Sequence, residues 1–598
     1  MENLAGRYLV LTANELTWPK KTPILFIGNW CITSERRLFC EDLDFLVVPY
    51  HFDDRKLLYT AYEYCQKIHE KLLDDLTTIL NEIFEIDNDK MYWRILLGYW
   101  LWNFVVVFYD RYLSLRNVLN THINIETTVL NKKSYIITES TIEFFGLTAT
   151  DDNFNLQIYS QIWESINGNI QNNIIIEHTE SRYAKKGKVG IYQNLFNFQI
   201  FQWFNRVLMS KADVLTFRTY IQKTSYIKWF FKLKGKIFPL EMLIDKFEKG
   251  IPIPEVDYES RNNLKINLKK LALKNDDEFY RICLELISAN IPISIFERYS
   301  NIKNTIKKVI KKTPTALISA NGFINDVWNI ISAEKANAGT KLINTQHGGG
   351  YGIQLFDGSE KHESEVADIF ITMGWGGNPN KNKYVPMPCP IMNQIKFNTS
   401  VKNGKILIIG NDYCRYFFRM FSHPIGKYVS TYRMWFDSFL DYLDDNVSSN
   451  TLVRLYPVEY DGGRHKAIKQ KHTKLQFDDY SRSFNYQLAQ CKVAVSDNNQ
   501  TTYLQSMAMN IPTIVFWNPK STEIRLEAQP FIDDLSKVKI LHYSPESAAT
   551  FLNQNFNTIS EWWNSTEVQE TRLRFVSNYA LLSKNWENDW IKFFETLD

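Results

Sequence analysis

The chain has 598 residues, which is too long for one ordinary hydrophobic core and favours two to four domains. Its 45% hydrophobic and 23% charged residues are typical of a folded globular protein and exclude a disordered chain. The 69 basic and 66 acidic residues leave a formal net charge of +3, without the basic excess of a dedicated nucleic-acid-binding protein.

The cysteines and the N-terminal residues bear on the cellular compartment. The seven cysteines are scattered and never spaced C-x-x-C, which argues against a disulfide framework or a cysteine-rich zinc site. The first residues lack the basic stretch and apolar run of a signal peptide. We therefore expect a cytoplasmic protein.

Short apolar runs in residues 1–110 predict strands. Residues 24–28 (ILFIG) and 45–50 (FLVVPY) suit strands that are buried on both faces of a parallel sheet. The most apolar stretch, 95–109, is shorter than the roughly 20 residues that cross a bilayer and includes Asn103. We expect it to form a buried helix.

Residues 111–312 are mostly helical in pattern and predict an insertion. Within them, the basic and aromatic stretch 228–236 (KWFFKLKGK) has two interpretations. It either packs as a helix with its lysines in solvent or rests on an anionic membrane surface. We favour packing and keep weak peripheral membrane association as the alternative.

Strand and helix patterns alternate again after residue 312. Apolar runs such as 341–345 (KLINT), 405–410 (KILIIG) and 492–496 (KVAVS) predict strands, with helical patterns between many of them. This alternation predicts right-handed β-α-β units and parallel sheets. The polar stretch 391–404 is interpreted as a linker between two sheets.

The predicted fold class is α/β, with two Rossmann-like, doubly wound domains that face a cleft and a large helical insertion in the first. Residues 1–110 and 313–395 would form the first domain, 111–312 the insertion and 396–598 the second domain. Because ligands bind outside the carboxyl ends of the strands in such sheets, we expect the site there.

Residues 346–352 (QHGGGYG) directly follow the predicted strand 341–345. His347 stands at the carboxyl end of this strand, where ligands bind. Consecutive glycines can adopt positive φ, so that their N–H groups approach an anion or a sugar phosphate closely. These glycines are Gly348, Gly349 and Gly350.

His362 and Glu363 follow, shortly before the predicted strand 368–373. A Glu beside a His in a cleft can act as a general acid or base, with a pKa tuned by burial. The alternative is a solvated helix face. The H-E-x-x-H spacing of a zinc site is absent from the sequence, and we expect no metal.

The polar turn 496–502 (SDNNQTT) leads from the predicted strand 492–496 into a helix. Hydroxyl groups and free N–H groups at a helix N-terminus bind phosphate, although plain N-capping is the alternative. The residues of this turn that we expect to bind an anion are Ser496, Asp497, Gln500, Thr501 and Thr502.

Arginines stand near two other predicted strand ends. Arg415 and Arg419 follow the strand 405–410, and Arg454 and Tyr456 lie at the end of the run LVRLYP. The guanidinium fork suits phosphate, and salt bridges to acids are the alternative. Polar or aromatic residues near the first two strands are further candidates for a pocket. These are Glu15, Trp18, His51, Asp53 and Arg55.

Several segments in the same order resemble one family. They are TWP before ILFIGNWC, then YHFDDR, QHGGGYG, HESEVADIFITMGW, RLYP, NIPTIVFW and a Trp-rich tail. The family is the surface-polysaccharide (O-antigen) transferases of Gram-negative bacteria, and the resemblance is weakest over 120–310. It implies the GT-B fold, with a nucleotide sugar held mainly by the C-terminal domain. The turn 496–502 is also similar to the phosphate-binding turn of Kdo and polyol-phosphate transferases, but Gln505 stands where a Glu is expected.

The resemblance implies a metal-independent glycosyltransferase without a cofactor, acting at the inner face of the membrane on an oligosaccharide or lipid-linked acceptor. The expected donor is a CMP-activated acidic sugar, either Kdo or a nonulosonic acid such as pseudaminic, legionaminic or sialic acid. UDP-, GDP- or dTDP-hexose transferases, CDP-polyol-phosphate transferases and a non-catalytic glycan-binding protein are the alternatives. We expect Glu363 to be the base and His347 to stabilise the departing phosphate. The candidates near the first two strands would bind the acceptor.

Overall fold

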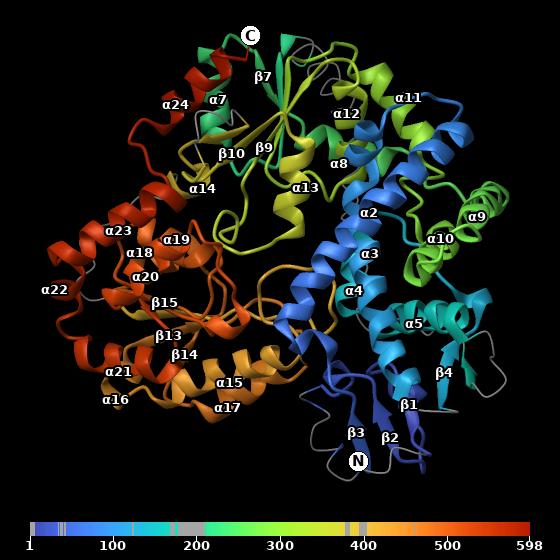
Figure 1. Ribbon diagram of the computed structural model, residues 1–598. Coiled ribbons are helices and arrows are strands. Elements are labelled where there is room, and N and C mark those ends of the chain that lie inside the picture. The colour runs from blue at the N-terminus through green and yellow to red at the C-terminus, as the bar shows by residue number, and fades with distance from the viewer. Residues whose placement is uncertain are drawn as a thin grey trace.

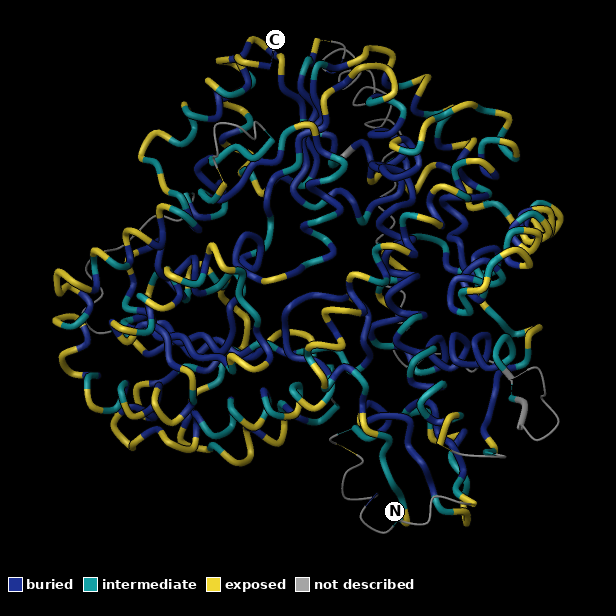
Figure 2. The backbone as a smooth tube through the Cα atoms, viewed as in Figure 1, coloured by how far each residue is buried: buried dark blue, intermediate teal, exposed yellow. Residues whose placement is uncertain are grey.

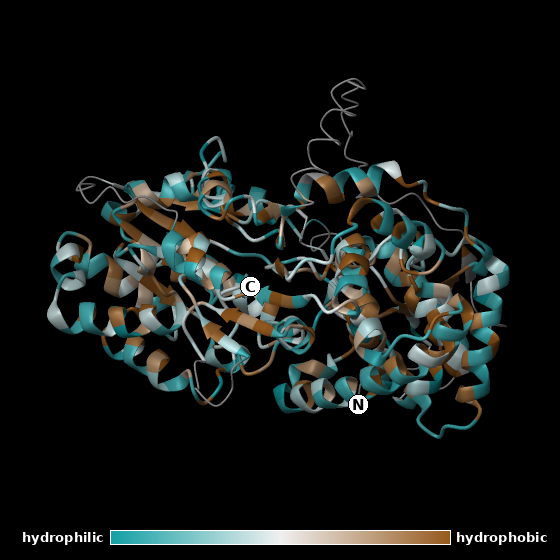
Figure 3. Cartoon of the chain, turned by 90° about the horizontal axis from the view of Figure 1, so that it is seen from above, coloured by the Kyte–Doolittle hydropathy of each residue, from teal (hydrophilic) through white to brown (hydrophobic). Residues whose placement is uncertain are grey.

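A computed structural model describes residues 6–33, 35, 40, 43–121, 125–167, 174–176, 209, 211–376, 383–393, 404–460 and 462–597. The described residues form three parallel sheets with helices packed around them (Figure 1). Figure 3 shows that hydrophobic residues are concentrated in the strands and on inner helix faces. We call the sheets N-terminal, middle and C-terminal.

The N-terminal sheet has five parallel strands in the order β3-β2-β1-β4-β5. Its first three strands come from the predicted region 1–110, and the other two lie beyond it. The strands are β1 Tyr8–Val10, β2 Ile24–Phe26, β3 Phe45–Val47, β4 Glu126–Leu130 and β5 Ile174–Ile176.

The middle sheet has six parallel strands in the order β11-β10-β9-β8-β6-β7, a doubly wound arrangement that reverses direction between β6 and β8. Its interior strands are apolar and buried, as expected where helices cover both faces. The strands are β6 Val214–Phe217, β7 Ile237–Pro239, β8 Ala316–Ser319, β9 Lys341–Thr345, β10 Ile369–Thr372 and β11 Tyr384–Pro386.

The C-terminal sheet has the order β14-β13-β12-β15-β16-β17, which is the 3-2-1-4-5-6 order of Rossmann folds. Its order changes direction between β12 and β15, so a crevice opens at the carboxyl ends of these two strands. The strands are β12 Ile406–Ile409, β13 Thr451–Arg454, β14 Gln476–Phe477, β15 Val493–Ser496, β16 Thr513–Phe516 and β17 Leu541–His542.

The predicted α/β class with Rossmann-like sheets is confirmed, but the first domain differs from the expectation. The strands of 1–110 and 313–395 do not share one sheet. The region 111–312, predicted to be a helical insertion, instead supplies β4 and β5 to the N-terminal sheet and β6 and β7 to the middle sheet. Strands of three to five residues are too short to show a periodicity that separates them from helix. The predicted linker 391–404 lies mostly outside the described residues.

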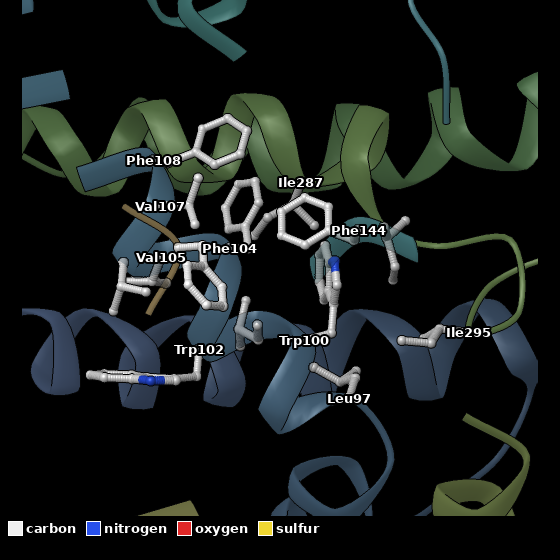
Figure 4. Packing of buried hydrophobic residues seen from close by; sticks show 14 of the residues in the cluster. Leu97, Trp100, Trp102, Phe104, Val105, Val107, Phe108, Phe144, Ile287 and Ile295 are labelled. Atoms are coloured by element: carbon white, nitrogen blue, oxygen red, sulfur yellow. The ribbon is translucent and has the colours of Figure 1, made fainter. Parts of the chain in front are cut away.

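Two long helices, α2 (Arg55–Phe84) and α3 (Lys90–Thr121), run between the N-terminal and middle sheets (Figure 1). The stretch 95–109 lies in α3 and is buried, as predicted. Trp100, Phe104 and Phe108 of α3 belong to a large apolar cluster, which Figure 4 shows from close by. α3 is long and apolar enough to span a membrane, but 94% of its most apolar window is buried inside the protein.

The last helix, α24 (Trp586–Glu595), returns to the middle sheet and packs on α7 (Lys223–Lys232). The ring of Trp229 stacks on Trp590 with centroids 6.3 Å apart, and Lys228 is exposed and pairs with Glu587. Residues 228–232 thus form the packed helix that we favoured, whereas residues 233–236 form the turn before β7.

Other helices pack against the sheets or, like α9 (Tyr258–Ala272) and α10 (Glu278–Asn290), against α2 and α3, and the buried parts of the chain in Figure 2 lie beneath them. The first group is α4 Thr141–Thr150, α5 Asp152–Asn167, α8 Glu241–Gly250, α9 Tyr258–Ala272, α10 Glu278–Asn290, α11 Tyr299–Val309, α12 Asp326–Ala336, α13 Gly358–Val366 and α14 Pro390–Asn393. The second is α15 Lys427–Asp441, α16 Asp445–Ser449, α17 Arg464–Lys471, α18 Phe484–Gln490, α19 Thr501–Ala508, α20 Gln529–Lys537, α21 Pro545–Asn555, α22 Ile559–Trp563 and α23 Thr566–Tyr579.

Candidate active site

A cavity of about 1180 Å³ lies where carboxyl ends of strands from the three sheets converge. Its wall contains residues that follow β2 and β3, β9, and β12, β13 and β15. This is the position at which open α/β sheets bind ligands. The polar wall residues used below are Asn411, Asp412, Arg415, Arg419, Arg433, His347, Asp357, Gln500, Thr501 and Thr502.

His347 and Glu363 form a pair at the end of β9. The Nδ1 atom of His347 lies 3.2 Å from the Oε1 atom of Glu363. The His347 side chain lines the cavity and is 21% exposed, whereas the Glu363 side chain on α13 is 1% exposed and lies behind it. Because Nδ1 is engaged, Nε2 is the ring atom left for a ligand. The side chain of Asn344 donates to the backbone carbonyl of Glu363 over 2.8 Å, which ties α13 to β9.

Burial and the contact between the two groups together shift the pKa values of His347 and Glu363. Burial raises the pKa of Glu363 to about 7, against the opposing effect of His347. Burial by itself would lower the pKa of His347, but the charge of Glu363 and the hydrogen bond to it outweigh burial, and the net shift is upward. The pKa of Glu363 therefore lies in the range that suits a general acid or base.

His362 faces away from the cavity. Its ring lies 5.6 Å from the ring of Tyr99, and a Cβ atom added to Gly98 would lie 3.2 Å from its Cε1 atom. Burial lowers the pKa of His362 to about 3, so the imidazole is neutral. The expectation that His362 takes part in catalysis is not supported by this position, because α13 turns adjacent side chains to different faces.

The glycine loop joins the middle sheet to the C-terminal sheet. The N–H of Gly349 donates to the Thr501 hydroxyl over 3.1 Å, and a Cβ atom on Gly349 would lie 2.7 Å from the Thr501 nitrogen. A Cβ atom on Gly350 would clash with Gln354. The expected positive φ is wrong for Gly348, Gly349 and Gly350. Glycine is required at residues 349 and 350 because neighbouring atoms lie too close for a side chain.

The turn 496–502 supplies the opposite wall. Gln500, Thr501 and Thr502 line the cavity at the N-terminus of α19. Ser496, Asp497 and Gln505, also predicted to bind the donor, are buried and do not line it as the described residues define it.

Asp497 instead holds the turn in place. Its carboxylate accepts hydrogen bonds from the side chain of Asn498 (2.6 Å), the N–H of Asn411 (3.3 Å) and the hydroxyl of Tyr432. Burial raises the pKa of Asp497 to about 6.

The predicted arginines separate into different roles. Arg415 lines the cavity, but its guanidinium lies 3.2 Å from the carboxylate of Asp152. Arg454 does not line the cavity among the described residues and pairs with Asp478, so the salt-bridge alternative is correct for it. Tyr456, two residues further on, does line the cavity.

The five expected acceptor-binding residues do not line this cavity as described. His51 lies 3.2 Å from Asp110, Asp53 accepts from the N–H of Lys427 over 2.8 Å, and Arg55 makes two hydrogen bonds to Glu523 at 2.6 and 2.8 Å. Asp53 and Arg55 therefore join the N-terminal part to the C-terminal part. The two others, Glu15 and Trp18, lie on or beside a short helix after β1. Residues that follow β2 and β3 line the cavity instead: Asn29, Trp30 and Tyr50.

A loop between β12 and α15, residues 410–426, contacts all three sheet regions, and we call it the crossover loop. The hydroxyl of Tyr416 donates to Asp152 over 2.5 Å. The ring of Phe417 lies 5.4 Å from that of Phe52. The N–H of Ser422 donates to the carbonyl of Phe356 over 3.0 Å. In the sequence, the one signal for the contacts of the crossover loop is its run of aromatic residues after a predicted strand.

Over the described part of the chain, His, Cys, Asp and Glu form no group of three or more suited to a metal.

Parallel, doubly wound sheets around one cavity, with a His–Glu pair opposite a helix N-terminus, define an α/β protein whose ligand site lies at the carboxyl ends of its strands. The sequence matches the LIC12162 family of transferases over residues 7–594, and the chain belongs to that family. No curated protein matches it.

Solved structures of low identity are similar to part of the chain. UDP-GlcNAc 2-epimerase from Neisseria meningitidis, bound to UDP-GlcNAc, is 9% identical with a TM-score of 0.33 and covers 61% of this chain and 98% of its own. MurG from Acinetobacter baumannii is 8% identical with a TM-score of 0.32 and covers 64% and 99%. WaaG, a glycosyltransferase involved in lipopolysaccharide biosynthesis, is 10% identical with a TM-score of 0.27 and covers 64% and 99%.

Proposed function

We propose that the chain is a glycosyltransferase that moves a sugar from a nucleotide-activated donor to a surface-polysaccharide or lipid-linked acceptor. The observation that carries the proposal is the contact between Gly349 and Thr501. It brings the His347–Glu363 pair and the N-terminus of α19 to one cavity. A base and an anion site therefore face the same space, as transfer of a sugar away from a phosphate requires.

In the proposed step, Nε2 of His347 takes the proton of the acceptor hydroxyl. The acceptor oxygen then forms a bond to the anomeric carbon while the bond from that carbon to the phosphate oxygen breaks, and the phosphate keeps the electron pair. Glu363 orients the imidazole and stabilises its charged form. This differs from the roles expected from the sequence: the base is His347 and not Glu363, because His347 faces the cavity and Glu363 does not.

The departing phosphate would meet the N-terminus of α19 and the hydroxyl groups of Thr501 and Thr502. Free N–H groups at a helix N-terminus favour negative charge, so they can stabilise the phosphate without a metal. One such terminus suits a donor with a single phosphate next to the nucleoside. We therefore propose a CMP-activated acidic sugar as the donor.

A thermal-shift series with CMP, CDP, UDP, GDP and dTDP, each with and without EDTA, tests this proposal. A ligand that binds the native state at about 100 times its Kd stabilises it by about 2.7 kcal/mol. We expect CMP to raise Tm in EDTA, and the Thr502→Val variant to lose most of the shift. A shift that requires Mg²⁺ would contradict metal independence, a shift with UDP alone would contradict the CMP donor, and no shift with any nucleotide would contradict the proposal.

A further inference from the structure

Three arginines line the cavity, and one of them differs from the others. Arg415 and Arg433 are paired with the carboxylates of Asp152 (3.2 Å) and Asp412 (3.0 Å). Arg419 is exposed at the cavity, and no described residue gives its guanidinium a hydrogen bond or an ion pair. A guanidinium that protein groups leave without an anion is available to a ligand.

Aromatic rings hold Arg419 in place. Its guanidinium carbon lies 4.6 Å from the ring centre of Phe421, 4.9 Å from that of Phe418 and 6.0 Å from that of Phe145. Such cation–π contacts orient the guanidinium without consuming its N–H donors.

The backbone beside Arg419 is fixed. Phe418, Met420 and Phe421 are buried, and the N–H of Gly358 donates to the carbonyl of Met420 over 3.4 Å. The side chain therefore projects from a segment anchored to the middle sheet region, although it belongs to the C-terminal domain.

The charge of Arg419 reaches the His347–Glu363 pair. It lowers the pKa of His347, as burial does, against the larger opposing effect of Glu363. The carboxylate of Asp357, which also lines the cavity, accepts from the N–H groups of Ser359 (2.7 Å) and Glu360 (3.2 Å) at the start of α13. The cavity thus holds a cation beside the base and a separate helix N-terminus on α19.

We propose that Arg419 forms a second anion subsite that binds an acidic group of the donor other than the phosphate at α19. This inference rests on the proposed function. Two sources supply this group: the carboxylate of an acidic sugar linked to a nucleoside monophosphate, or the second phosphate of a nucleoside diphosphate. In either case the bound group is a pair of anionic oxygen atoms that accept hydrogen bonds from the guanidinium group.

Calorimetric titration distinguishes the two sources. The probes are CMP-N-acetylneuraminic acid, CMP, UDP and inorganic pyrophosphate, each added to the wild type, Arg419→Gln and Arg419→Lys. Arg482→Gln is the matched control, because Arg482 also stacks on a ring, that of Tyr486 at 5.2 Å, but does not line the cavity. If Arg419→Gln does not fold, Arg419→Lys replaces it in the test. This variant keeps the positive charge but cannot donate two parallel hydrogen bonds.

We expect Arg419→Gln to weaken binding about 10- to 100-fold for the ligand that carries the second anion, with CMP unchanged. Loss confined to CMP-N-acetylneuraminic acid assigns the carboxylate, and loss confined to UDP and pyrophosphate assigns a second phosphate. Equal binding of every probe to Arg419→Gln and the wild type overturns the subsite and leaves the proposed function standing. Pyrophosphate binding that depends on Arg419, without binding of any nucleotide, supports the subsite and overturns the proposed function.

Discussion

The backbone N–H of Gly349 donates to the hydroxyl of Thr501 over 3.1 Å and so joins a loop of the middle sheet to a helix of the C-terminal sheet. The two backbones approach so closely that no side chain fits between them at residue 349. The N-terminus of α19 and His347 are therefore held at a fixed separation. A side chain added at residue 349 should therefore move His347 away from the N-terminus of α19.

Substitution of adjacent glycines tests this contact. Gly349→Ala places a Cβ atom 2.7 Å from the Thr501 nitrogen, and overpacking of this kind costs about 1–3 kcal/mol. We expect lower Tm and lower transferase activity. Gly348→Ala is the matched control, since its Cβ would meet nothing closer than 4.0 Å. Equal Tm and activity of the two variants would contradict the role of the contact.

Activity should depend on His347 and, through it, on Glu363. His347→Asn should lower kcat by roughly 10²–10⁴, the usual contribution of general acid–base catalysis. For the wild type, kcat/KM should rise with pH as the pair loses its proton near pH 7. Glu363→Gln should move this rise to lower pH, because the carboxylate no longer raises the pKa of His347. His362→Gln should keep the wild-type profile, and a profile unchanged in Glu363→Gln would refute the pairing.

The free energy of unfolding should depend on pH because of Asp497. Burial raises the pKa of this carboxyl from 3.8 to about 6, so the folded protein binds the proton more tightly than the unfolded chain. Its contribution is complete below about pH 4 and is lost as the pH rises to about 6. Relative to Asp497→Asn, the wild-type free energy of unfolding should fall over this window by up to about 3 kcal/mol. Urea denaturation across the window measures it, and a constant difference would contradict the assignment.

The ion pair between Arg525 and Glu360 should couple the C-terminal and middle regions. The guanidinium donates to both carboxylate oxygens, over 3.0 and 2.9 Å, and both groups are largely buried. Each single Met substitution should cost about 2–4 kcal/mol, and the double variant should lose less than the sum. Lys471→Met, which breaks an exposed pair with Asp441, should cost less than about 1 kcal/mol. Additive losses in the Arg525–Glu360 cycle would exclude the coupling.

Arg454 should matter for stability and not for nucleotide binding. Its removal leaves the fully buried carboxylate of Asp478 without its cation, at a cost of about 1–3 kcal/mol. We expect Arg454→Met to lower Tm while the CMP-induced shift in Tm stays that of the wild type. Weaker CMP binding by this variant would restore the phosphate-binding role that the sequence suggested.

The strands that build the site could be predicted from the sequence, because apolar runs in the C-terminal half end in polar turns. This placed His347 and Thr501 at carboxyl ends of parallel strands before any contact was known. The partners of the arginines were not accessible. Arg415 pairs with Asp152 and Arg454 with Asp478, and no local pattern shows which guanidinium such remote acids neutralise.

Local sequence patterns could not predict the separate N-terminal sheet either. Its completion depends on β4 and β5, short segments far along the chain from β1 and adjacent to it only in space. Glu363 illustrates the same limit on a smaller scale. The sequence made it a candidate acid or base beside His362, but only packing decides that it lies behind His347, which faces the cavity.

The crossover loop has a consequence for exchanging parts between related chains. It is encoded with the C-terminal domain, yet its aromatic residues pack on the N-terminal region and its backbone pairs with the start of α13. Replacing the C-terminal domain to change the donor would replace this part of the wall near the N-terminal sheet as well. A chimera that leaves the N-terminal contacts intact therefore has to keep residues 410–426 of the original chain, while β12 and the residues after Gly426 are exchanged together as one sheet.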